Sequence, residues 1–140
     1  MTIARLSLIT INCADQEELA GFWAALLGGE IVYRAENIAV VHTERGTLCA
    51  ARVADYEPPT WPGGATPHHI HFELVVEDLD VAQVEAVRLG ARVAETQPQP
   101  DKWRVLLDPA GHPFCLTMHL PLLPLGTRAE DAQKADDTQE

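Results

Sequence analysis

The sequence predicts an α+β fold made of two similar units, each with the order strand, helix and three strands. Three observations lead to this prediction. Apolar residues alternate with polar ones in several short segments and recur at helical spacing in two longer segments. Both helical segments follow an aspartate and stop at a glycine, and the two halves repeat this order. With 46% hydrophobic residues, the 140-residue chain can bury a core.

The first unit, predicted over residues 1–57, begins with a strand at 5–13. A helix follows Asp15, which suits an N-cap, and apolar side chains recur along it at helical spacing. Trp23 belongs to this apolar face and is therefore expected in the core. Gly28 allows the helix to end in a left-handed turn. Short strands are then expected at EIVYR, IAVVH and TLCAARV.

A linker is predicted at residues 58–68, because the stretch 54–68 contains four prolines and two glycines. The second unit is predicted over 69–120, with a first strand HIHFELVV, a helix after Asp78 and three further strands. The segment 121–140 is expected to be a tail that is disordered at its end, since its last residues lack large apolar side chains.

The two units are predicted to be an internal repeat. Asp15 and Asp78 lie 63 residues apart, while Gly28 and Gly90 lie 62 residues apart, and each glycine precedes a short strand that contains valine. Units of this size cannot bury their sheet faces alone and must pack together.

Charge and composition exclude several classes of partner. The net charge of -11 and the absence of a Lys/Arg cluster argue against nucleic acid and anionic membrane. No apolar run reaches the roughly 20 residues that span a bilayer, and the N-terminus lacks signal-peptide features. We therefore expect a cytoplasmic location. The three cysteines, Cys13, Cys49 and Cys115, are expected to be buried thiols.

Histidines and a glutamate lie together at the start of the second unit, at 68–73. If 69–76 is one strand, Ile70 and Phe72 face the core, while His69, His71 and Glu73 face a cleft. These three are candidate metal ligands, and Glu73 could alternatively be a general base. Ligands in a row on one straight strand diverge, however, so an ordinary polar strand face is the alternative.

Other candidate site residues come from separate segments. Asp108 to Gly111 is expected to form a tight turn. On the strand after it, Cys115 and Thr117 share one face, so Cys115 can line the cleft. Trp61 and Trp103 suit either a pocket wall or an interface.

These motifs together (DQEELAGFWAALLGG, PPTWPGG, HIHFELVVEDLD, LGARV and DPAGHPFCL) resemble the glyoxalase-like branch of the vicinal oxygen chelate superfamily, which includes bleomycin resistance proteins and extradiol dioxygenases. The resemblance implies paired βαβββ modules whose curved mixed sheets surround a cleft, often in homodimers. It also implies a divalent metal held by four cleft positions. In this sequence those positions fall on Leu8, on Ala50 or Ala51, on His71 and on Cys115.

Because Leu8 and both alanines lack a donor atom, we expect a protein without the usual metal site that binds a small hydrophobic or aromatic molecule, as resistance or sequestration proteins do. Its ligand-binding residues would be His69, His71, Trp61, Trp103 and Cys115. No cofactor is expected, although a divalent metal is possible. The alternative is a lyase, isomerase or dioxygenase with His71 and Glu73 as catalytic residues. A third reading is an interaction module. A homodimer is expected in addition to a small-molecule ligand.

Overall fold

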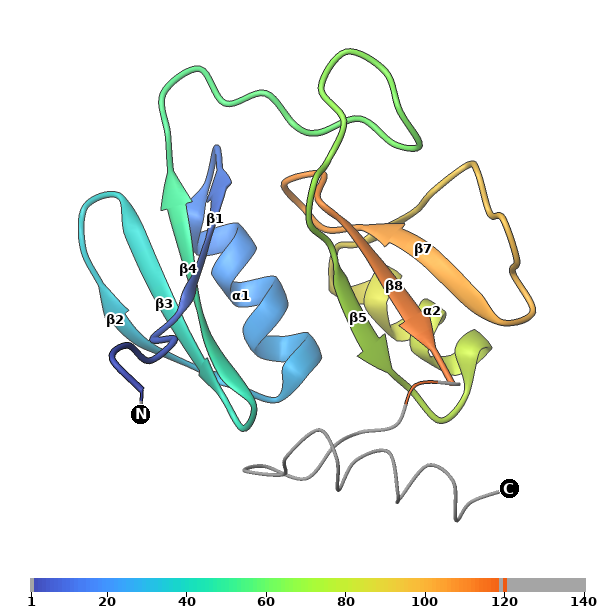
Figure 1. The fold of residues 1–140 in the computed structure, drawn as a ribbon, viewed down its shortest axis with the longest axis horizontal. Helices are drawn as coiled ribbons and strands as arrows, with labels where there is room; N and C mark the ends of the chain where they lie inside the picture. The colour runs from blue at the N-terminus through green and yellow to red at the C-terminus, as the bar shows by residue number, and fades with distance from the viewer. Residues whose placement is uncertain (1, 119, 121–140) are drawn as a thin grey trace.

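The predicted repeat is present in the computed structural model, which describes residues 2–118 and 120 (Figure 1). The first module contains β1 (Ile9–Cys13), α1 (Gln16–Leu27), β2 (Glu30–Arg34), β3 (Ile38–Thr43) and β4 (Gly46–Arg52). The second contains β5 (Phe72–Val75), α2 (Leu79–Leu89), β6 (Arg92–Val93), β7 (Trp103–Leu107) and β8 (Pro113–Thr117). The α+β class and the two βαβββ modules are thus confirmed. The predicted tail at 121–140 lies outside the described residues.

The two sheets have the same topology. Their strand orders are β1-β4-β3-β2 and β5-β8-β7-β6, and in each sheet the first strand pairs in parallel with the last. The remaining neighbours are antiparallel. The first strand of each module therefore lies at an edge of its sheet.

Both first strands are shorter than predicted. The strand expected from residue 69 starts at Phe72, whose partner is Phe114 on β8. The residue before Phe114 is Pro113, which has no N–H to extend the ladder. The strand expected from residue 5 starts at Ile9, whose partner on β4 is Leu48.

Both helices begin and end at the predicted residues. The Asp15 carboxylate accepts hydrogen bonds from the N–H groups of Glu17 and Glu18, and Asp78 accepts one from Val81. Gly28 has φ 66°, a left-handed conformation that favours glycine and allows the chain to turn directly into β2.

The helices lie on the inner sides of the two sheets, and one core is shared by both modules. In Figure 1, α1 lies between the sheet of β1 to β4 and strand β5. Trp23 of α1 is 1% exposed, as expected of a core residue, and its ring contacts Phe72 and Phe114 of the second sheet. Ile70, which was expected in this core, is instead 80% exposed because it precedes β5.

Among residues 2–118 and 120, neither helix lies on the opposite face of either sheet. Within the part of the chain that the structure describes, no helix is long and apolar enough to cross a bilayer.

Candidate functional site

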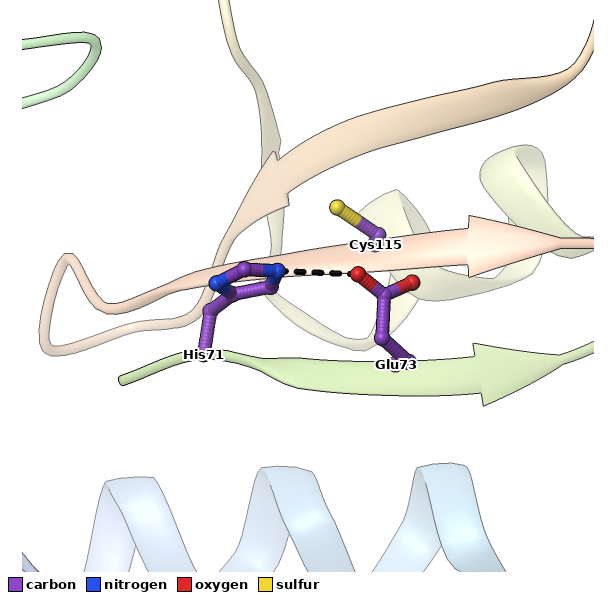
Figure 2. A group of neighbouring side chains, drawn as sticks. All are labelled: His71, Glu73 and Cys115. Atoms are coloured by element: carbon purple, nitrogen blue, oxygen red, sulfur yellow. Dashed lines mark hydrogen bonds and ion pairs between the residues drawn. The ribbon is translucent and has the colours of Figure 1, made fainter. Parts of the chain in front are cut away.

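The outer face of the second sheet brings together three side chains with metal-binding or acid–base chemistry. Glu73 on β5 pairs with Cys115 on β8, so the two side chains leave the sheet on the same side. His71 lies two residues before Glu73, and its Nε2 lies 2.8 Å from Glu73 Oε1 (Figure 2). One donor atom from each of the three lies within 4.8 Å of the other two.

The thiol of Cys115 keeps its proton in this setting and is therefore a poor nucleophile. Burial raises the pKa of Cys115 to about 12, and the negative charge and hydrogen bonding of Glu73 act in the same direction. Cys115 is 7% exposed, whereas the side chains of His71 and Glu73 are each 39% exposed. A small molecule or an ion could therefore reach the imidazole and the carboxylate from solvent.

His68 and not His69 lies beside His71. The ring centroids of His68 and His71 are 5.3 Å apart, and those of His68 and Trp61 are 5.1 Å apart. Burial lowers the pKa of His68, and the neighbouring His71 and His69 add to this effect, so the ring favours its neutral form. His69 is exposed. Sequence alternation does not apply to these residues because they precede the strand.

Trp61 and Trp103 pack on the same outer face. Both contact a small buried cluster formed by Ala94, Val105 and Cys115. The Trp61 indole comes from the linker and donates a hydrogen bond to the carbonyl of Thr96. The structure thus brings the two tryptophans, one from the linker and one from β7, to the face that carries Cys115.

A hollow of about 550 Å³ opens beside Trp103 on this face. Its lining residues are Glu73, Lys102, Trp103, Thr117 and Leu120. Lys102 was not predicted as a site residue from the sequence. Its position directly before Trp103, an aromatic residue of β7, is the sequence feature that could have indicated it. A second hollow of about 700 Å³ follows the β5 edge, where His71 and Glu73 meet residues of the first module such as Leu8 and Leu27.

The first module carries a matching face with different chemistry. Thr10, Cys49 and Val40 are cross-strand neighbours, as are Glu73, Cys115 and Val105 in the second module. The counterpart of Cys115 is therefore Cys49, and the placement near Ala50 or Ala51 was wrong. The prediction placed this position by counting residues from the turn before the last strand. The count fails in the first module because its β3–β4 turn is shorter than the β7–β8 turn of the second.

The residues present do not fit a metal site that draws equally on both modules. Leu8 lies two residues before Thr10, as His71 lies two before Glu73, and Leu8 has no donor atom. Cys49 occupies the position on that face that matches Cys115 and provides a thiol there. Within the described part of the chain, a three-donor set of imidazole, carboxylate and thiol is found on the second module and not on the first.

The model of the glyoxalase-like domain matches residues 8–117. The chain belongs to the glyoxalase-like domain family. This glyoxalase-like protein also has solved structural relatives across the glyoxalase, bleomycin resistance and dioxygenase superfamily. A comparison with curated proteins found no match.

Three solved structures illustrate the likeness. An enzyme of the glyoxalase/bleomycin resistance protein/dioxygenase family from Burkholderia phytofirmans is 15% identical, with TM-score 0.62 over 81% of this chain and 97% of that one. A fosfomycin resistance protein, FosX, from Listeria monocytogenes, complexed with Mn(II) and dihydroxypropylphosphonic acid, is 19% identical, with TM-score 0.64 over 85% and 93%. A glyoxalase-related enzyme from Fulvimarina pelagi is 18% identical, with TM-score 0.63 over 89% and 94%. At these identities the likeness shows the fold.

Proposed function

We propose that this glyoxalase-like protein binds a small hydrophobic or aromatic molecule on the outer face of its second sheet, as a resistance or sequestration protein would. The observation that carries the proposal is the pair Trp61 and Trp103, which cover the Cys115 cluster beside the 550 Å³ hollow. Apolar walls with a few convergent polar groups are typical of small-molecule sites.

The polar groups of the site suit one polar end of such a ligand. The Glu73 carboxylate and Lys102 line the hollow, and the His71 imidazole lies 2.8 Å from the Glu73 carboxylate. A hydroxyl or carbonyl group could hydrogen-bond to the imidazole or the ammonium, while the flat part of the molecule packs on the indole of Trp103. His69, being exposed next to His71, is retained as a contributor at the rim.

A second copy of the chain would complete the cleft. Both outer faces point away from the shared core, and each is partly apolar: Val40 and Cys49 lie on one face, Val105 and Cys115 on the other. Because the two modules have the same topology, the outer face of one copy's first module can oppose the outer face of the other's second module. We therefore propose a homodimer, and a reducing cytoplasmic setting that suits its three free thiols.

The test uses 1-anilinonaphthalene-8-sulfonate as a flat aromatic probe. Calorimetric titration of EDTA-treated protein should give saturable binding, and Trp103→Ala should weaken it by roughly tenfold or more, which corresponds to about 1.4 kcal/mol. Val84→Ala is the control, since Val84 is 70% exposed on α2 and therefore lies on the helix side of the sheet, away from this face. Equal effects of the two variants on probe binding would contradict the proposed binding site. A protein that sediments only as a 15.3 kDa monomer would contradict the dimeric cleft.

A second candidate function is catalysis, favoured by the 2.8 Å contact between His71 and Glu73. A carboxylate that orients an imidazole is a common arrangement for general acid–base chemistry. Lyase, isomerase and dioxygenase substrates such as hemithioacetals and catechols would be offered to the protein. Turnover by the wild type that is lost in Glu73→Gln, with probe binding retained, would establish an enzyme.

A further inference from the structure

The outer face of the second module also has the chemistry of a metal site that does not depend on the small-molecule function. We propose that His71, Glu73 and Cys115 bind a thiophilic divalent ion, zinc above all. The three donors come from two adjacent elements, β5 with the residues before it and β8, and all lie within one module. Figure 2 shows the imidazole and the carboxylate facing each other, with the sulfur on the same side of the sheet.

The separations are close to those that a bound ion requires. Donor atoms around a tetrahedral zinc ion lie roughly 3.5 Å apart, given zinc–ligand bonds of about 2.0–2.3 Å. The three donor atoms lie within 4.8 Å of one another, and the closest pair is 2.8 Å apart. Shifts of about an ångström therefore suffice, and the half-exposed side chains of His71 and Glu73 are free to make them.

The donor types select the ion. Imidazole, carboxylate and thiolate together suit Zn²⁺ and its spectroscopic substitute Co²⁺, whereas Mg²⁺, Ca²⁺ and Mn²⁺ prefer oxygen ligands. The neighbouring carboxylate of Glu73 would neutralise part of the charge of the ion. Glu73 is not one of the four superfamily positions, whereas His71 and Cys115 are two of them, and Leu8 at another has no donor atom.

Three protein ligands leave a fourth coordination position open. Glu73 lines the hollow beside Trp103 and Lys102, and both His71 and Glu73 line the 700 Å³ hollow along the β5 edge, so the site is open to both hollows. Water or a polar group of a bound molecule could occupy the fourth position, as in zinc sites with three protein ligands. The metal would then lie at the polar end of the aromatic pocket.

Cobalt titration of tag-free, EDTA-treated full-length protein tests the site. A thiolate-to-cobalt charge-transfer band in the near ultraviolet and d–d bands in the visible should appear with one ion per chain, and zinc should displace them. Cys115→Ser and Cys115→Ala should both abolish the charge-transfer band, while Glu73→Gln should weaken binding more than about tenfold. Circular dichroism checks that each variant remains folded.

Cys49→Ser and His69→Ala are the matched controls and should leave the spectrum unchanged. No charge-transfer band in the wild type, or a band that survives both Cys115 variants and disappears in Cys49→Ser, would overturn the proposal. The probe titration of EDTA-treated protein separates this result from the small-molecule function. Probe binding without cobalt binding would refute only the metal site, and cobalt binding without probe binding would refute only the aromatic pocket.

Discussion

The indole Nε1 of Trp23 donates a hydrogen bond of 3.0 Å to Asp108 Oδ2, and this contact joins α1 of the first module to the turn after β7 in the second. Both side chains are buried, Asp108 completely. Its other oxygen accepts hydrogen bonds from the backbone N–H groups of Ala110 and His112. One carboxylate therefore holds the predicted Asp108–Gly111 turn and the module interface together.

Asp108→Asn should destabilise the protein by about 1–3 kcal/mol. An asparagine oxygen could keep the two turn hydrogen bonds, but its NH₂ group would then face the N–H of Trp23, donor against donor. Urea unfolding measures the loss. Asp101→Asn, at an exposed position, is the control and should have little effect. Equal stabilities of the two variants would contradict the role assigned to Asp108.

The difference in stability between the wild type and Asp108→Asn should depend on pH. Burial raises the pKa of Asp108, against the opposing effects of His112 and of the hydrogen bonds it accepts. A raised pKa in the folded state means that the stability this group contributes is complete below its unfolded pKa and is lost as the pH rises through the folded value. The difference in unfolding free energy between wild type and Asp108→Asn should therefore be larger at acidic than at neutral pH. A difference that grows with pH would refute this account.

Tyr56 should contribute stability that disappears in alkali. Its hydroxyl donates a hydrogen bond of 2.5 Å to the carbonyl of Ala110, and burial raises its pKa from 10.0 to about 12. The contribution is therefore complete below pH 10 and falls as the pH rises toward 12. Tyr56→Phe should lose about 0.5–1.5 kcal/mol at neutral pH and lack the alkaline decline. Unfolding curves across this range, with tyrosinate absorbance, provide the measurement.

The three cysteines should react slowly in the folded, metal-free protein. All are buried and unpaired, and burial raises the pKa values of Cys13 and Cys115, the latter to about 12. Since the thiolate is the reactive form, Ellman's reagent at mildly alkaline pH should modify them only after urea is added. A rapid burst of one equivalent in native buffer would show that one thiol is activated.

The two helix caps should differ in strength. Asp15 accepts two backbone hydrogen bonds, at 3.0 and 3.1 Å, whereas Asp78 accepts one at 3.0 Å. Asp15→Ala should cost about 1 kcal/mol, and Asp15→Asn much less. Asp78→Ala should cost no more than Asp15→Ala. Thermal unfolding of the three variants measures the order, and a neutral Asp15→Ala would be inconsistent with the capping geometry.

Local signals were sufficient to predict the fold. The capping aspartates, the glycines at the helix ends and the periodic apolar residues act over a few neighbours, so the sequence reveals them directly. Strand ends were less predictable because they depend on the partner strand. Ile70 was placed in the core by extending an alternation that stops at Phe72, where the ladder meets Pro113.

The site was predictable in part for the same reason. Alternation on the last strand placed Cys115 and Thr117 on one face, which the structure confirms. The neighbours of Cys115 come from β5, β7 and the linker. No local sequence pattern predicts contacts between residues that lie so far apart in the chain. Trp61 reaches this face through the course of a proline-rich segment, and His68 approaches His71 through a non-repetitive backbone.

The shared register of the two modules means that each outer-face position in one module has a counterpart in the other. Each face has one valine–cysteine pair at the same height. The first module has Leu8 and Thr10 where the second has His71 and Glu73, and Ile38 and Ala51 where the second has Trp103 and Thr117. The double substitution Leu8→His and Thr10→Glu would therefore copy the reactive set onto the half that lacks it. Cobalt binding by that variant with two ions per chain would show that the shared register alone is enough to place the three donors in either half.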